Sequence, residues 1–190
     1  MLYTAFVNVA PGGQLTKQLS TDFLTWLKED TSQKEVYLYE GLYLTDQESS
    51  PPNGQYAYAS GIKILASIDN EQLDIVFMNR EAFDIFSQNG YLCNLEELLS
   101  AENITVFDKI KPSLVTNTVI LKDNLEEIQA DSSIMYEAVT KDYPMGLDLS
   151  STELIKNAGF EDTVYLGIIA NSPRTKTAAM YVTYLFEEQL

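Results

Sequence analysis

Apolar and polar positions over the first 44 residues predict a strand, a helix and a second strand. The run Leu2–Val9 is rich in β-branched and aromatic residues, which favours a strand. Apolar residues recur at helical spacing from Leu15 to about Glu29, and tyrosines alternate with other residues from Val36 to Leu44. A strand–helix–strand unit of this kind indicates a parallel pair of strands.

The middle of the chain continues this alternation of helices and strands. Apolar residues at helical spacing predict a helix between 58 and 68. They are Tyr58, Ile62, Leu65 and Ile68. The short apolar run Leu73–Met78 is typical of a buried central strand. A short helix, Arg80–Asn89, follows this strand directly.

The last third of the chain adds two features of different kinds. Leu114–Lys122 and Ile134–Thr140 are predicted as an antiparallel pair of strands joined by a long polar connection. Val164–Ala170 is an apolar strand, and Ser172 followed by Pro173 is typical of the start of a helix. These elements predict an α/β fold, a three-layer sandwich with a mostly parallel central sheet, in which 164–170 could run antiparallel. We expect residues 1–190 to form one domain.

Charge limits the partners of such a domain. The formal net charge is −16, with 28 acidic and 12 basic residues. This surface repels phosphate backbones and anionic membranes, so we expect no nucleic-acid partner and no direct membrane binding. Solubility is the simplest interpretation of the acidity.

The supply of catalytic and metal-binding residues is poor. The chain has no histidine and a single cysteine, Cys93, which lies among apolar neighbours and is interpreted as a buried thiol. The commonest general base and the commonest neutral metal ligand are therefore missing. Asp69, Glu71 and Asp74 cluster loosely without a calcium-loop pattern and are interpreted as a solvated face. We expect no enzyme activity, no cofactor and no metal.

Candidate ligand-binding residues lie where strands are followed by helices. Ligands of open α/β sheets bind at the carboxyl ends of strands, where backbone N–H groups are free. The candidates are Asn8, Gly12, Gly13, Asn79 and Arg80. An ordinary turn at the glycines, a helix cap at Asn79 and a surface ion pair of Arg80 are the simpler alternatives.

Tyrosine is the other residue type suited to recognition. Tyr37, Tyr39 and Tyr43 share one face of the second strand by its period of two. Such a face suits a sugar, a peptide or a protein, and core packing explains it equally well.

Three segments resemble the extracellular solute-binding proteins of bacterial ABC importers. Residues 62–68 followed by Leu-Asp-Ile at 73–75 resemble a helix, a polar turn and a Leu-Asp-Val strand of that family. Residues 83–98 (FDIFSQNGYLCNLEEL) resemble its helix that ends in Gly-x-Leu before a leucine-containing turn. Residues 164–185, with Asn-Ser at 171–172, resemble its later strand and helix. Together the three segments cover roughly half of the chain.

The resemblance implies one lobe of a type II periplasmic binding protein, because full members have two lobes and are longer than 190 residues. The chain is similar to the short, membrane-anchored relatives of these proteins in Gram-positive bacteria. The implied function is a non-enzymatic, extracytoplasmic module that binds a neutral or amphipathic solute, such as a sugar or a peptide, and works with a membrane transport partner. The alternative is a structural or protein–protein interaction domain of an anchored surface protein that has lost its ligand.

The start of the chain leaves its location open. Met1-Leu2-Tyr3-Thr4 shows no basic segment before an apolar one, so no signal peptide is expected here. A cytoplasmic protein and a surface protein whose signal or anchor is absent from this chain both fit. The resemblance favours the surface protein.

Overall fold

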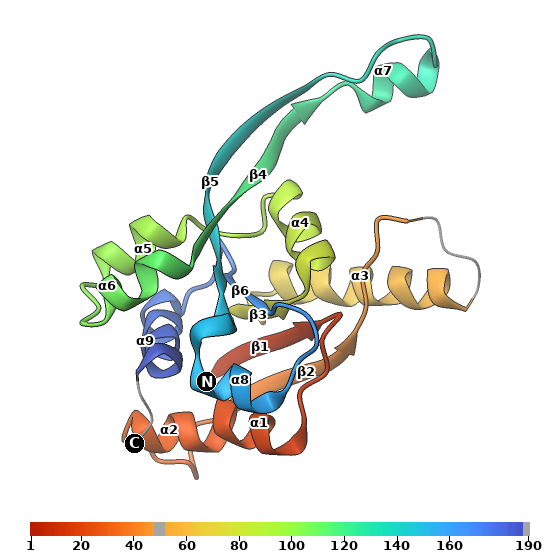
Figure 1. Cartoon of the computed structure of the whole chain (residues 1–190). Helices are drawn as coiled ribbons and strands as arrows, with labels where there is room; N and C mark the ends of the chain where they lie inside the picture. Colours follow the sequence, from red (N-terminus) through yellow and green to blue (C-terminus); the bar gives the residue numbers. More distant parts are fainter. Residues whose placement is uncertain (48–51, 188–190) are drawn as a thin grey trace.

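One six-stranded sheet forms the centre of the molecule (Figure 1). The computed structural model describes residues 1–47 and 52–187. The strands lie in the order β2-β1-β3-β6-β5-β4. Their bounds are β1 Leu2–Val7, β2 Val36–Leu42, β3 Ile75–Met78, β4 Leu114–Asp123, β5 Ala138–Asp148 and β6 Tyr165–Ile168.

The directions of the strands divide the sheet into two parts. β1 runs parallel to both β2 and β3, as the strand–helix–strand pattern predicts. The pairs β3–β6, β5–β6 and β4–β5 are antiparallel. The sheet is therefore mixed, and the expectation of a mostly parallel sheet is not confirmed. Helical crossovers bring the chain back in the same direction for β2 and β3, whereas β5 follows β4 through a hairpin.

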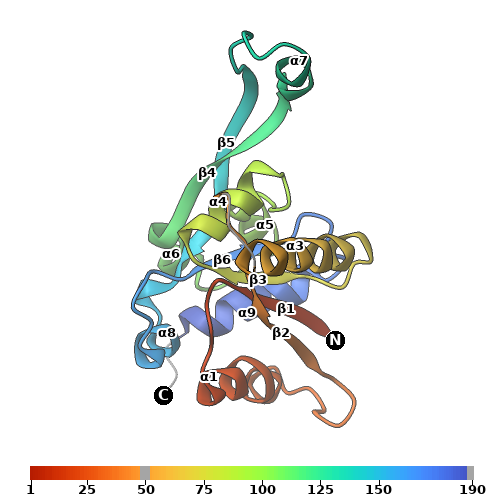
Figure 2. The ribbon, with the colours of Figure 1, turned by 90° about the vertical axis from the view of Figure 1, so that its right-hand side faces the viewer.

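Helices cover both faces of the sheet, which confirms the α/β class (Figure 2). One core cluster unites the sheet with α1, α2, α5, α6, α8 and α9, and the other unites it with α3 and α4. The α-helices are α1 Gly13–Lys17, α2 Phe23–Trp26, α3 Asn53–Asp69, α4 Arg80–Gln88, α5 Leu95–Ala101, α6 Phe107–Ile110, α7 Leu125–Ala130, α8 Glu153–Ala158 and α9 Thr175–Phe186. The π-helical turn is η1 Gln18–Asp22, and the two 3-10 turns are η2 Lys111–Ser113 and η3 Leu149–Ser151.

β3 is the central strand that its sequence predicts. All four of its residues are completely buried. Ile75 and Phe77 point into one core cluster, whereas Val76 and Met78 point into the other. Phe77 stacks on Phe6 of β1 with 5.0 Å between the ring centroids, which ties the two strands together across one face.

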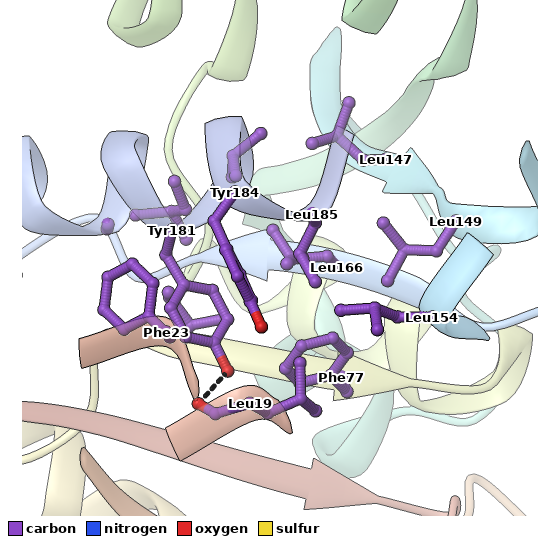
Figure 3. Close-up of a cluster of buried hydrophobic side chains, with 14 of the residues drawn as sticks. Leu19, Phe23, Phe77, Leu147, Leu149, Leu154, Leu166, Tyr181, Tyr184 and Leu185 are labelled. Atoms are coloured by element: carbon purple, nitrogen blue, oxygen red, sulfur yellow. Dashed lines mark hydrogen bonds between the residues drawn. The ribbon is translucent and has the colours of Figure 1, made fainter. Parts of the chain in front are cut away.

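A π-helical turn, η1, joins α1 to α2 and is held by two tyrosines of the last helix, and Figure 3 shows the contact of Tyr181 with Leu19. The hydroxyl of Tyr181 donates to the carbonyl of Leu19 over 2.7 Å, and that of Tyr184 donates to the carbonyl of Gln18 over 2.8 Å. Burial raises the pKa of Tyr181 well above its ordinary value. The start and the end of the chain are thus fastened together within the core.

Helix α3 confirms the helix that the spacing predicts, and it begins earlier, at Asn53. Its buried residues are Ser60, Ile64 and Ile68. Of the four residues whose spacing predicted the helix, Tyr58, Ile62 and Leu65 are exposed and only Ile68 is buried. The side of α3 that packs on the sheet is therefore not the side that most of these four residues occupy.

The strands β4 and β5 extend beyond the body of the molecule as a two-stranded ribbon with α7 at its tip (Figures 1 and 2). The antiparallel pair is confirmed, but its second strand runs over residues 138–148 rather than 134–140. The ladder continues past Thr140 and pairs Leu147 with Leu114. We call residues 120–142 the arm, and none of them is buried.

Candidate functional site

The carboxyl ends of β1 and β3 bring two of the predicted site residues together. Asn8 follows β1 and Asn79 follows β3, and the two strands are neighbours. The side-chain amide of Asn8 donates to Oδ1 of Asn79 over 3.1 Å. The carboxyl ends of these two neighbouring strands therefore meet at Asn8 and Asn79.

Both amides also hold the surrounding backbone. Nδ2 of Asn8 donates to the carbonyl of Leu44 over 2.7 Å, and its Oδ1 accepts from the Leu44 backbone N–H over 2.8 Å. Oδ1 of Asn79 accepts from the backbone N–H of Ala82 over 3.0 Å and caps α4. The helix-cap alternative for Asn79 is thus confirmed. Most of the hydrogen-bonding groups of these two side chains are therefore used by bonds within the protein.

Arg80 lies beside this pair and makes the surface ion pair that was its simpler interpretation. Its Nε is 3.0 Å from Oδ1 of Asp84, one helical turn later, and both side chains are about half exposed. The guanidinium also lies over the rings of Phe83 and Tyr165, at 5.5 and 5.7 Å from their centroids. An exposed i,i+4 pair of this kind contributes only about 0.3–0.5 kcal/mol.

The glycines of the predicted site line a hollow of their own. Gly12 and Gly13 begin α1 and face Asn157 and Ala158 at the end of α8 across a shallow hollow of about 280 Å³. A Cβ atom on either glycine would meet nothing within 4 Å. The lining of this hollow includes Gln14 and Gln18, but it does not include Asn8, Asn79 or Arg80. The five predicted residues therefore do not share one pocket.

The tyrosines of the second strand form a stacked surface with the first strand. Tyr37 and Tyr39 stack on Tyr3 of β1, with centroid distances of 5.0 and 6.3 Å. Tyr43 lies after the end of β2 and stacks with Tyr56 instead. Arg174 lies 4.9 Å from the Tyr3 ring centroid. Contacts within the chain thus occupy part of this aromatic surface.

Asp74 is the one predicted surface carboxylate whose placement is wrong, because its side chain is completely buried. Nε of Arg174 lies 2.8 and 3.0 Å from its two oxygens, and Oγ of Ser172 donates to it over 2.6 Å. The backbone N–H of Tyr3 donates to it over 2.8 Å. Ser172 thus serves this network, and α9 begins at Thr175. A buried carboxylate whose partners all come from the fold is structural.

Within residues 1–47 and 52–187, no group of three or more Asp, Glu or Cys side chains is placed to hold a metal ion. Burial raises the pKa of Cys93 to about 12, so its thiol stays protonated at neutral pH. Within the same residues, no helix has the length and hydropathy to cross a membrane.

The arm is the surface that the sequence did not reveal as a candidate site. Six of its large apolar side chains are 38–82% exposed. They are Leu121, Leu125, Ile134, Met135, Tyr136 and Val139. The signal in the sequence was a set of large apolar residues interspersed with acids at positions 121–139, in the two predicted strands and the polar connection between them.

In comparisons with known proteins, no family model, no curated protein and no solved structure matches the chain.

Proposed function

We propose that the chain is a non-enzymatic recognition module that binds a protein partner through the arm. The observation that carries the proposal is a projecting, 23-residue ribbon in which no residue is buried. By itself, a two-stranded ribbon has marginal stability in water. Exposure of its apolar side chains to water is unfavourable, and a partner that covers them would remove this cost. Burying one large apolar side chain contributes about 1.5–3 kcal/mol.

The charges of the arm indicate the chemistry of its partner. Residues 120–142 contain six acidic side chains and two lysines. A partner surface with apolar side chains and a rim of Lys or Arg complements this composition. Nucleic acids and anionic membranes carry the same sign of charge as the arm and are repelled by it.

The resemblance to solute-binding proteins supplies the setting of the proposal. It supports a surface protein held by an anchor outside this chain, with a membrane transport protein among the partners to be tested. The mixed sheet then acts as the platform from which the arm projects. The side chains of Asn8 and Asn79 form hydrogen bonds with the protein's own backbone. For this reason an interaction domain, rather than a solute-binding module, is the leading interpretation.

Solute binding at the sheet edge is the second candidate, and one observation favours it. The hollow beside Gly12 and Gly13 is open, and a side chain added there meets nothing within 4 Å. A neutral or amphipathic ligand such as a sugar or a peptide would suit its polar lining. For a ligand found in a screen of sugars and peptides, Gly13→Trp is expected to abolish binding without unfolding the core. Unchanged affinity in that variant would remove the hollow from consideration.

Site-specific photo-crosslinking tests the arm directly. A photo-reactive amino acid is placed at Met135, which is 82% exposed at the tip, and at Glu96 on α5 as the control. We expect one partner protein to be crosslinked from position 135 in cells of the source organism and not from position 96. Equal crosslinking from both positions would indicate non-specific contact and count against the arm.

Purified proteins then test the chemistry of the contact. Met135→Asp is expected to weaken binding of the crosslinked partner at least about tenfold, the effect typical of a central interface residue. Ala101→Asp, which introduces the same charge at an exposed position of α5, is the control and should leave affinity unchanged. Binding should also weaken as salt rises, because opposite charges attract. An arm variant that binds like the unaltered protein would overturn the proposal.

A further inference from the structure

A second apolar surface lies on α3, on the side opposite to the sheet. At about 100° per residue, Ile62 lies about 200° around the helix axis from the buried Ser60. Tyr58, Ile62 and Leu65 on this outer side are 73%, 53% and 45% exposed. Ala59 and Ala66 are exposed beside them. We call these five residues, with Gln55 and Asp69 at the two ends, the α3 stripe.

The α3 stripe is almost free of charge in a chain whose net charge is −16. The 17 residues of α3 contain one lysine, Lys63, and one acid, Asp69. Lys63 lies off the stripe, and its Nζ is 5.3 Å from the centroid of the Tyr39 ring. Two copies of an acidic protein repel each other over most of their surfaces. The α3 stripe is a face at which this repulsion is small.

The positions of the α3 stripe are symmetric about Ile62. Tyr58 and Ala66 lie four residues before and after it, and Ala59 and Leu65 lie three residues before and after it. Gln55 and Asp69 lie seven residues away on either side. A two-fold axis through Ile62 therefore places each large side chain of one helix against a small side chain of the other.

We propose that the α3 stripe binds a second copy of this chain in an antiparallel helix pair, with the two Ile62 side chains in contact on the two-fold axis. Tyr58 of each copy packs on Ala66 of the other, and Leu65 packs on Ala59. This arrangement is isologous, as the interfaces of closed dimers are. It also places Asp69 of each copy near the positively polarised start of α3 in the other copy, which is favourable.

The composition of the surface favours a second copy over the other occupants. A helix that binds a lipid surface carries basic residues beside its apolar face, and α3 has a single lysine. One helix face buries less than the roughly 800 Å² per partner of a standard stable interface. We therefore expect a weak dimer, with a dissociation constant of about 10–100 µM.

Sedimentation analysis over a range of concentrations tests for this dimer. The unaltered chain should change from monomer to dimer across the micromolar range. Ile62→Asp puts two carboxylates together on the axis and should raise the dissociation constant at least about tenfold. Met135→Asp introduces the same charge on the arm and is expected to leave the dimer intact. Because the copies carry like charges, added salt should strengthen the dimer, in contrast to binding by the arm.

Cysteine crosslinking tests the geometry. Under oxidising conditions Ile62→Cys alone should give a covalent dimer, whereas Tyr58→Cys alone and Ala66→Cys alone should not. A mixture of the Tyr58→Cys and Ala66→Cys proteins should crosslink to each other. The native Cys93, which is partly buried, is replaced by Ala in every variant, and thermal unfolding checks that each variant is folded. A chain that stays monomeric at about 1 mM, or a dimer that Ile62→Asp does not weaken, would overturn the proposal.

Discussion

A single carboxylate, Asp74, connects three separate parts of the chain at the start of β3. Its partners are the backbone of Tyr3 in β1 and the side chains of Ser172 and Arg174 before α9. The carboxylate is completely buried, and about a quarter of the Arg174 side chain remains exposed. Breaking such a pair leaves buried polar groups without a partner, which costs more than the pair itself contributes.

We expect Asp74→Ala to lower the free energy of unfolding by about 3–5 kcal/mol, measured by urea denaturation. The lost partner leaves the guanidinium of Arg174 and the Tyr3 N–H poorly satisfied. Asp162→Ala removes an exposed carboxylate and should change stability by less than about 0.5 kcal/mol. Similar stabilities for the two variants would show that the Asp74 network does not hold the fold together.

The protonation of Cys93 gives a second prediction for one residue. Burial raises the pKa of its thiol to about 12, above the value of about 8.5 in an unfolded chain. The folded state therefore keeps a proton that the unfolded state loses, and stability should fall as pH rises from about 8.5 towards 12. The thiol should react with iodoacetamide at pH 8 only after the protein unfolds. Cys93→Ala should reduce the dependence of stability on pH, and rapid alkylation of the folded protein would contradict the assignment.

At the scale of elements, the contact between α4 and β5 depends on a missing side chain. A Cβ atom at Gly146 of β5 would lie 2.5 Å from Cζ of Phe83 in α4. Phe83 is completely buried, and its ring stacks on that of Tyr165 at 5.1 Å. The ring therefore has little room to move, and the two elements pack closely only because residue 146 is glycine.

Gly146→Ala is expected to destabilise the protein by about 1–3 kcal/mol in thermal or urea unfolding. Adding Phe83→Leu to that variant should restore part of the loss, because a smaller side chain makes room for the new methyl group. Gly12→Ala is the control, since its Cβ would meet nothing within 4 Å and its φ of −80° suits alanine. A Gly146→Ala protein as stable as the control would show that the ring can shift freely.

The sequence predicted some elements better than others, and α3 shows the reason. Its existence follows from the spacing of its apolar residues, but it has apolar residues on both sides, so periodicity does not select the buried one. A polar contact contributes to the choice: Oγ of Ser60 accepts from the backbone N–H of Tyr43 over 3.1 Å. Such a contact involves residues 17 positions apart, and no local pattern reveals it.

The strand β5 illustrates a second limit. Its predicted end at Thr140 reflects the polar residues and Pro144 that follow, which disfavour a strand. Pro144 nevertheless pairs with Thr116 in the ladder, in a part of β5 that has β4 as a partner on one side and meets β6 only at Leu147 and Asp148. A proline is tolerated on such an edge. Tertiary pairing therefore decided the bounds of this strand.

At the scale of the whole molecule, the α/β class and the central position of β3 could be predicted, because they follow from hydrophobic runs and their spacing. The adjacency of β1 and β3 brings Asn8 and Asn79 together. The separate hollow at Gly12 and the projecting arm could not be predicted. Both depend on where α8 and β5 lie, and these positions result from packing between distant segments.

The position of β6 has a consequence for how the chain folds during synthesis. β6 pairs with the edge of β3 that faces away from β1. Tyr165 nevertheless leaves the ribosome about 90 residues after Ile75. At 5–20 residues per second the ribosome needs roughly 5–18 s for that interval, during which this edge of β3 has no strand beside it. A nascent chain with an unpaired apolar strand is prone to aggregate, so this protein should depend on cotranslational chaperones more than a domain whose neighbouring strands are consecutive.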